Sequence, residues 1–107
     1  MPEKHYLIFL DIDARKRHYH VREAGRIIKF VVQLEIKIGE EWKEVIRYDC
    51  AHDYAHKDFY NIRGQHKKIN LRLDYEDALT LAEDDINENW EIYREKFFKG
   101  DFPRGEK

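Results

Sequence analysis

The sequence predicts an α+β protein in which an antiparallel sheet of four or five strands carries one long C-terminal helix on one face. Residues 28–38 alternate between apolar and polar side chains, which is the period of a strand with one buried face. Residues 75–97 repeat apolar side chains at spacings of three and four, which is the period of an amphipathic helix. We expect one domain over the 107 residues, with strands within 5–73 and a helix over about 75–99.

The two N-terminal strand candidates differ in polarity. Residues 6–12 are apolar on nearly both faces, which suits a central or covered strand. Residues 13–25 hold six Lys, Arg and His side chains. We interpret this segment as a solvated strand end or hairpin, because surface Lys and Arg are ordinary, and a phosphate-binding arm is the alternative.

The even positions of residues 28–38 define the core face of the sheet. A three-residue loop would pair Ile38 with Trp42 and put Trp42, Ile46 and Tyr48 on this face. Neighbouring side chains then point to the other face, which one helix cannot cover. The apolar side chains expected there are Val31, Val45 and Ile62.

The next hairpin is expected to turn at Asp53 and Tyr54. The register that follows pairs Glu44 with Arg63 and Tyr48 with Phe59 on the core side, and Arg47 with Tyr60, Asp49 with Asp58 and Ala51 with His56 on the other side. The sequence therefore predicts a group of polar side chains on the face opposite the helix.

The predicted helix has clear ends. Asp74 is a good N-cap, and Gly100 followed by Pro103 provides a stop. The apolar stripe consists of Tyr75, Leu79, Ala82, Ile86, Trp90, Tyr93 and Phe97. The acidic side chains Glu83, Asp84, Asp85, Glu88 and Glu91 are expected on a solvated face.

Composition excludes several classes of protein. No apolar stretch approaches the roughly 20 residues of a membrane helix, and the N-terminal residues lack the apolar region of a signal peptide, so we expect a cytoplasmic protein. The single Cys50 can form neither an internal disulfide nor a cysteine-based zinc site. A charged fraction of 39% favours a thermophilic source.

The polar group could cleave RNA without a metal, because RNA supplies its own nucleophile in the 2′-hydroxyl. His52 and His56 would act as general base and general acid, since both titrate near neutral pH. Arg47 would bind the phosphate and Tyr60 would donate to the developing oxyanion. Asp49 or Asp58 would orient an imidazole.

Two other hypotheses use the same residues. Asp49, His52 and His56 could bind one divalent metal ion if the turn brings them together. Alternatively, His52 and Asp53 only shape the turn, the carboxylates bind Arg47 or Lys57, and no residue reacts. In that case the protein is an interaction module whose uncovered sheet face binds a partner or a second copy of the chain.

These residues also carry a family resemblance over roughly residues 26–98. The matching positions are Arg47-Tyr48-Asp49, Ala51-His52, His56, Gly64, and in the helix Ala78-Leu79, Asp85-Ile86 and Asn89-Trp90. They resemble the TumE-like small toxins of prokaryotic toxin–antitoxin pairs. The family has a further histidine where this chain has Asp58. The resemblance implies a growth-inhibiting, RNA-directed protein that pairs with an antitoxin protein.

Overall fold

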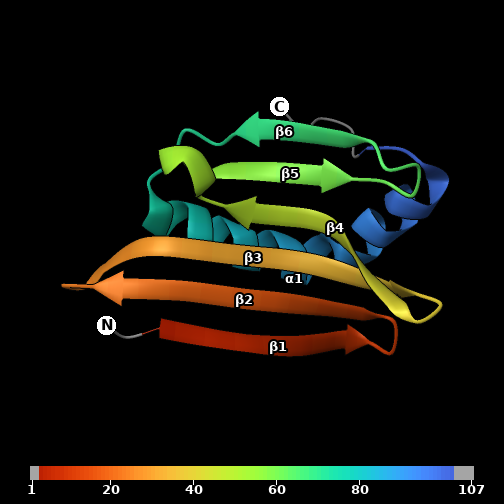
Figure 1. Ribbon diagram of the computed structural model, residues 1–107, viewed down its shortest axis with the longest axis horizontal. Helices are drawn as coiled ribbons and strands as arrows, with labels where there is room; N and C mark the ends of the chain where they lie inside the picture. Colours follow the sequence, from red (N-terminus) through yellow and green to blue (C-terminus); the bar gives the residue numbers. More distant parts are fainter. Residues whose placement is uncertain (1–2, 103–107) are drawn as a thin grey trace.

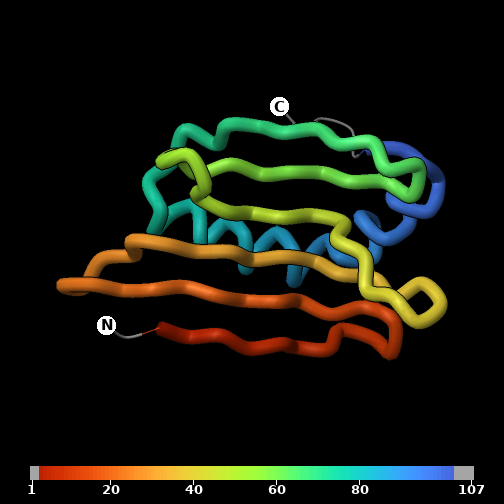
Figure 2. The backbone as a smooth tube through the Cα atoms, in the orientation of Figure 1, coloured from red at the N-terminus to blue at the C-terminus, as the bar shows by residue number. Residues whose placement is uncertain are grey.

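The computed structural model describes residues 3–102. It has an α+β fold in which a six-stranded antiparallel sheet carries one long C-terminal helix on one face (Figure 1). The strands cross the sheet in sequence order as a meander, so β1 and β6 are the two edges (Figure 2). The elements are β1 (Glu3–Asp11), β2 (Ala14–Glu23), β3 (Arg26–Ile38), β4 (Glu41–Asp49), the 3₁₀ turn η1 (Ala51–Asp53), β5 (His56–Tyr60), β6 (His66–Asn70) and α1 (Tyr75–Lys99).

The prediction of four or five strands is too low. The basic segment expected as a solvated strand end or hairpin forms the long strand β2, which pairs with both β1 and β3. An interior strand tolerates these charges because α1 neutralises those that point to the core. Lys16 is buried, and its ammonium donates to Glu83 Oε1 at 2.8 Å and to Asn87 Oδ1 at 2.7 Å.

The core lies between the sheet and α1, as predicted, and α1 packs mainly on β3 and β4. Ile28, also expected on the core face, is 41% exposed, whereas the next four even positions of β3 are fully buried, namely Phe30, Val32, Leu34 and Ile36. They face the α1 stripe, in which Ala78, Leu79, Ala82, Ile86, Tyr93 and Phe97 are buried. Each large aliphatic side chain removed from water in this way contributes about 1.5–3 kcal/mol of stabilisation.

The two predicted caps of the helix that lie within the described residues, Asp74 and Gly100, are confirmed. Asp74 Oδ1 accepts a hydrogen bond from the Asp77 N–H at 2.8 Å. Gly100 takes the left-handed conformation at φ 76°, and its N–H bonds to carbonyls of the last helical turn. The stop expected at Pro103 lies outside the described residues. Within residues 3–102, no helix is long and apolar enough to cross a membrane.

The acidic side of α1 is only partly solvated, which corrects the prediction for two residues. Glu83 binds Lys16 and His18 of β2, and Asp85 binds Lys57 of β5. Both carboxylates border the apolar stripe and reach back to the sheet. Cationic side chains on the core face of β2 and β5 need these partners, because an unpaired buried charge is strongly unfavourable.

The register between β4 and β5 differs from the prediction by two residues. Tyr48 opposes Lys57 and Ile46 opposes Phe59, where Tyr48 was expected opposite Phe59. The connection is longer than expected because η1 contains two residues in the left-handed region, His52 and Asp53, both at φ 68°. A two-residue shift keeps every side chain on its predicted face, since the strand period is two.

The same shift changes the neighbours on the uncovered face. Asp49 opposes His56, and Arg47 opposes Asp58. The predicted pairs of Arg47 with Tyr60, Asp49 with Asp58, Ala51 with His56 and Glu44 with Arg63 are therefore wrong.

A β-bulge in β4 corrects two further predictions. The loop between β3 and β4 is one residue shorter than expected, so Ile38 opposes Glu41 and Trp42 opposes Lys37. Trp42 thus leaves the core face, and the Arg15 guanidinium stacks 4.0 Å from its ring centroid. The register shifts between Leu34 and Glu35, after which the predicted pairing holds. Val45 lies at this bulge and is buried in the core rather than exposed.

Candidate functional site

The face of the sheet that α1 leaves uncovered carries a cluster of polar side chains. Arg47 and Asp49 alternate with core residues in β4, and His56 and Asp58 do the same in β5, so all four point away from the helix. The neighbouring strands add further polar groups to this side. We call the set the polar face; it consists of Arg15, Arg17, Gln33, Glu35, Arg47, Asp49, His56, Asp58, Tyr60, His66 and Lys68.

His56 lies between two carboxylates at the centre of the polar face. Its Nε2 is 2.5 Å from Asp49 Oδ1, and its Nδ1 is 3.4 Å from Asp58 Oδ2. Asp49, His56 and Asp58 are 5%, 2% and 4% exposed. Neither ring nitrogen of His56 makes a hydrogen bond of normal geometry, and Asp58 Oδ1 makes none either. The three residues thus form a buried cluster with unused ligand atoms.

The predicted pairing of His52 with His56 is not present. His52 is exposed in η1, whereas the three residues whose ligand atoms lie within 4.8 Å of one another are Asp49, His56 and Asp58. The metal set Asp49, His52 and His56 is corrected in the same way, since Asp58 takes the place of His52. The left-handed backbone of the turn moves His52 out of the strand ladder.

Two guanidinium groups and one imidazole reach over buried carboxylates toward solvent. Arg47 Nε lies 2.5 Å from Asp49 Oδ2, and their side chains are 34% and 7% exposed. Arg17 Nε lies 2.9 Å from Glu35 Oε2, with exposures of 32% and 6%. These carboxylates hold the guanidinium groups in place, and further nitrogens also donate, Arg47 Nη1 to Gln33 and Arg17 Nη2 to Glu35. Both side chains remain about one third exposed, so part of each guanidinium can still meet an anion.

His66 is the third of these groups. Its Nε2 lies 3.2 Å from Asp58 Oδ1, and the side chains are 44% and 6% exposed. The Tyr60 ring stacks on the His66 ring at a centroid distance of 4.6 Å. His66 is thus an accessible imidazole supported by a buried carboxylate and an aromatic ring, whereas His56 is covered.

Tyr60 keeps its proton over the physiological range. Burial raises its pKa to about 12, and the nearby charges of Glu44 and Asp58 act in the same direction. A neutral phenol can donate a hydrogen bond to an anion. Tyr60 opposes His66 across β5 and β6, not Arg47 as predicted.

Sequence reasoning missed His66, Gln33 and Glu35 as parts of this face. Gln33 links Arg47 to Glu35, because its amide oxygen accepts from Arg47 at 3.0 Å and its amide nitrogen donates to Glu35 at 2.6 Å. The sequence did contain a signal for two of them, because Gln33 and Glu35 occupy odd positions of β3 and so point to the face opposite the core. His66 is the first residue of β6.

A second polar cluster, which sequence reasoning also missed, lies beneath α1. Asp85 accepts hydrogen bonds from the hydroxyls of Tyr48 at 2.5 Å and Tyr93 at 2.7 Å, and Lys57 donates to it at 3.0 Å. Burial by itself would raise the pKa of Asp85, but these donors hold that pKa below its ordinary value. The cluster is enclosed between helix and sheet, so we assign it a structural role.

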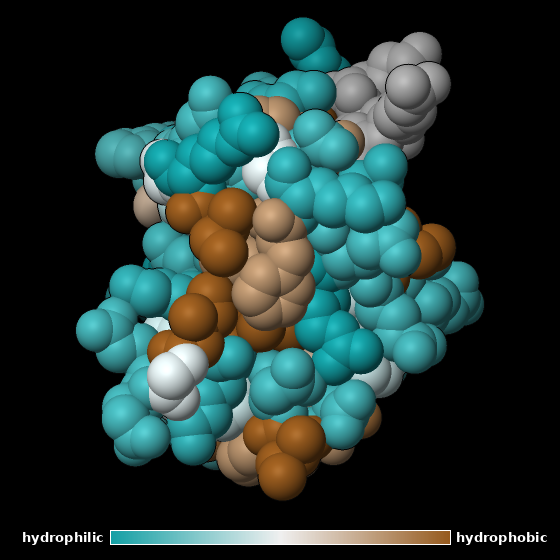
Figure 3. Space-filling view, turned by 90° about the vertical axis from the view of Figure 1, so that its right-hand side faces the viewer, coloured by the Kyte–Doolittle hydropathy of each residue, from teal (hydrophilic) through white to brown (hydrophobic). Residues whose placement is uncertain are grey.

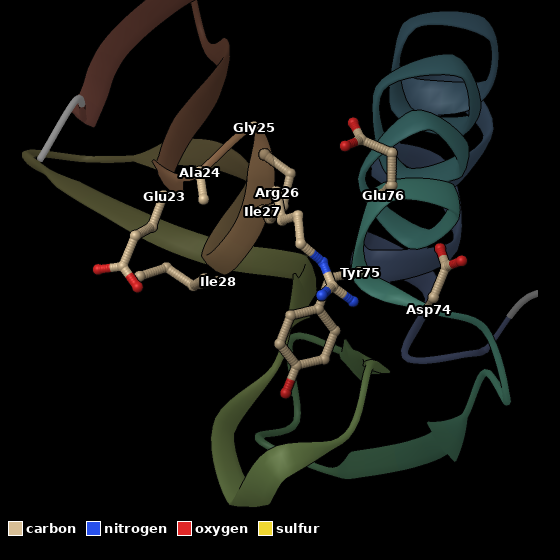
Figure 4. A pocket seen from close by; sticks show the side chains of 9 residues that line it. All are labelled: Glu23, Ala24, Gly25, Arg26, Ile27, Ile28, Asp74, Tyr75 and Glu76. Atoms are coloured by element: carbon tan, nitrogen blue, oxygen red, sulfur yellow. The ribbon is translucent and has the colours of Figure 1, made fainter.

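A hollow of the described surface lies away from the polar face. It has a volume of about 670 Å³ and lies between the β2–β3 hairpin and the start of α1 (Figure 4). Figure 4 shows the Arg26 side chain extending toward Tyr75. Its acidic residues Glu23, Asp74 and Glu76 are exposed, as in an ordinary solvated groove. The polar face is therefore the better candidate for chemistry.

Fold and site together define a small α+β protein whose open sheet face presents cationic groups above buried carboxylates. The sequence matches the family model described as "Domain of unknown function (DUF7718)" over residues 1–103, and the chain belongs to this family. Comparisons with curated proteins and with solved structures each found no match.

Proposed function

We propose that the polar face binds the phosphate backbone of RNA and cleaves it by acid–base chemistry. The observation that carries this proposal is the repeated pairing of a solvent-accessible guanidinium or imidazole with a buried carboxylate at Arg17, Arg47 and His66. Guanidinium groups held in this way bind phosphate oxygens in a bidentate manner. Several oriented cations on one face suit a ligand with regularly spaced negative charges.

The chemical step assigns roles to three groups. His66 takes the proton of the RNA 2′-hydroxyl, and its contact with Asp58 stabilises the imidazolium that forms. The 2′-oxygen bonds to the adjacent phosphorus while the bond from phosphorus to the 5′-oxygen breaks. The products are a 2′,3′-cyclic phosphate and a 5′-hydroxyl, whose oxygen takes its proton from solvent. Arg47 and neutral Tyr60 stabilise the charge on the phosphate oxygens.

This assignment changes the roles predicted from sequence. His56 is too deeply buried to meet a phosphodiester, so it and Asp49 serve as positioning residues beneath Arg47 and Asp58. His52 has no role. The resemblance to TumE-like toxins supports an RNA substrate and an antitoxin partner that covers the polar face when the protein is inactive.

The test is cleavage of an end-labelled RNA by the purified protein in a buffer with EDTA. Replacing His66 with Gln should slow cleavage by about 10²–10⁴-fold, the usual contribution of a general base. His52→Gln is the matched control, because His52 is an exposed imidazole outside the cluster. Equal rates for the two variants would remove His66 from the mechanism, and an inactive parent protein would remove the proposal itself.

A second candidate function is association through edge strand β1. Its exposed apolar side chains are Tyr6, Leu7, Ile8 and Phe9. An uncovered apolar edge favours strand addition. A second copy could add antiparallel with Ile8 opposite Ile8, which places His5 opposite Asp11 and keeps the faces continuous.

Apolar side chains also reach the surface at the end that carries the β1–β2 turn and the C-terminal end of α1 (Figure 3). There Ile12 is 87% exposed.

Sedimentation at increasing protein concentration tests the edge-strand dimer. Ile8→Lys should abolish it, whereas Ile92→Lys on the exposed side of α1 should not. A parent protein that stays monomeric at high concentration would remove this candidate.

A further inference from the structure

The cluster of Asp49, His56 and Asp58 is built in a way that hydrogen bonding within the protein does not explain. The three residues come from two adjacent strands and are nearly fully buried. Their ligand atoms lie within 4.8 Å of one another. Both ring nitrogens of His56 and one oxygen of Asp58 nevertheless lack hydrogen bonds. These atoms do lie in ion-pair contact with neighbouring side chains, but the contacts are not hydrogen bonds of normal geometry, so the cluster can take a further partner.

Charge leads to the same conclusion. Arg47 neutralises one of the two carboxylates through Asp49 Oδ2. The two carboxylates and Arg47 together leave one negative charge in the buried group, which a bound cation would compensate. A metal ion would take one imidazole nitrogen and carboxylate oxygens as ligands.

The spacing suits a metal ion. His56 Nδ1 and Asp58 Oδ2 are 3.4 Å apart, and two ligands each at roughly 2.0–2.1 Å from a tetrahedral ion are about 3.3 Å apart. Each ring nitrogen of His56 faces a carboxylate. One nitrogen can therefore bind the ion while the other donates its N–H to the remaining carboxylate, the arrangement common around metal-bound histidines.

We propose that His56 and Asp58 bind one divalent transition-metal ion of the kind that takes mixed nitrogen and oxygen ligands, such as Zn²⁺, Mn²⁺ or Co²⁺, while Asp49 accepts the other ring N–H of His56. The ion lies beneath the cationic side chains of the polar face. Asp58 then contacts both the ion and His66, and the proposed RNA cleavage does not require the ion. The inference does not depend on RNA cleavage, because its tests measure the metal.

The test uses the full chain after EDTA treatment and dialysis. Calorimetric titration with Zn²⁺ and Co²⁺ should give one ion per chain, and bound Co²⁺ should show visible absorption bands that depend on its ligands. Each ion should also raise the melting temperature, because it binds the folded protein. Asp58→Asn and His56→Gln should weaken binding by at least tenfold. The control is Asp53→Asn with His52→Gln, an exposed acid and imidazole of the neighbouring turn.

A second measurement uses the parent protein and therefore does not depend on whether the variants fold. The ¹⁵N chemical shifts of His56 in the parent protein should change when Zn²⁺ is added and should report one metal-bound nitrogen. The proposal is overturned if no ion binds at millimolar concentration, if Asp58→Asn binds like the parent, or if both His56 nitrogens carry protons with and without metal. Metal binding without RNA cleavage would contradict only the proposed function, and cleavage without metal binding only this inference.

Discussion

The polar cluster beneath α1 offers the sharpest test of how this fold is stabilised. Replacing Asp85 with Asn preserves size and removes the charge that accepts bonds from Tyr48, Tyr93 and Lys57. Lys57 is left buried beside a neutral amide, since its side chain is only 4% exposed. Breaking one side of a buried ion pair destabilises a protein by about 3–5 kcal/mol. That is a large part of the roughly 5–15 kcal/mol by which small domains are stable.

The assay is equilibrium unfolding in urea together with thermal melting. At roughly 4 °C per kcal/mol for a chain of about this length, the melting temperature of Asp85→Asn should fall by about 12–20 °C. Asp84→Asn is the matched control, because its carboxylate is exposed on the same helix, and it should change stability by less than about 0.5 kcal/mol. If Asp85→Asn and Asp84→Asn lose the same stability, the cluster does not stabilise the fold as argued.

Two further predictions concern stability. Because the folded pKa of Asp85 lies below its usual 3.8, its contribution is complete above about pH 4 and is lost as the pH falls through the folded pKa. The free energy of unfolding should therefore fall less steeply below pH 4 in Asp85→Asn than in the parent, and identical acid slopes would refute this. Gly39 and Gly100 both have positive φ, so changing either to Ala should cost about 1–2 kcal/mol. The two losses should be similar in urea titrations, because the atom that a Cβ at Gly100 would meet, Arg63 Nε at 2.5 Å, lies at the end of a flexible, exposed side chain that can move away; a much larger loss at Gly100 would contradict this.

The parts of the fold that follow a simple period could be predicted from sequence. The even positions of β3 from Phe30 to Ile36 and most of the α1 stripe are apolar at periods of two and 3.6 and are buried as expected, whereas Ile28 is exposed. β2 could not be recognised from apolar alternation, because its core-facing positions include Lys16 and His18. Their carboxylate partner, Glu83, is more than 60 residues away in sequence, so local pattern gives no sign that these charges are neutralised.

The sequence predicted which face of the sheet carries the candidate site, but not which residues oppose one another across its strands. Arg47, Asp49, His56 and Asp58 share a face because a two-residue shift preserves parity. The partner of each residue depends on the length of the connection, which the left-handed backbone of His52 and Asp53 sets. Residues other than glycine enter that conformation only rarely, so a local pattern could not predict it.

The measurement that tests the account most directly compares two end-labelled oligonucleotides in EDTA. One is all RNA, and the other has 2′-deoxyribose at every position. The account predicts that the protein cuts only the RNA and leaves 2′,3′-cyclic phosphate ends, because the 2′-oxygen is the nucleophile and His66 takes its proton. RNA that remains intact, or equal cutting of the two strands, would contradict the account.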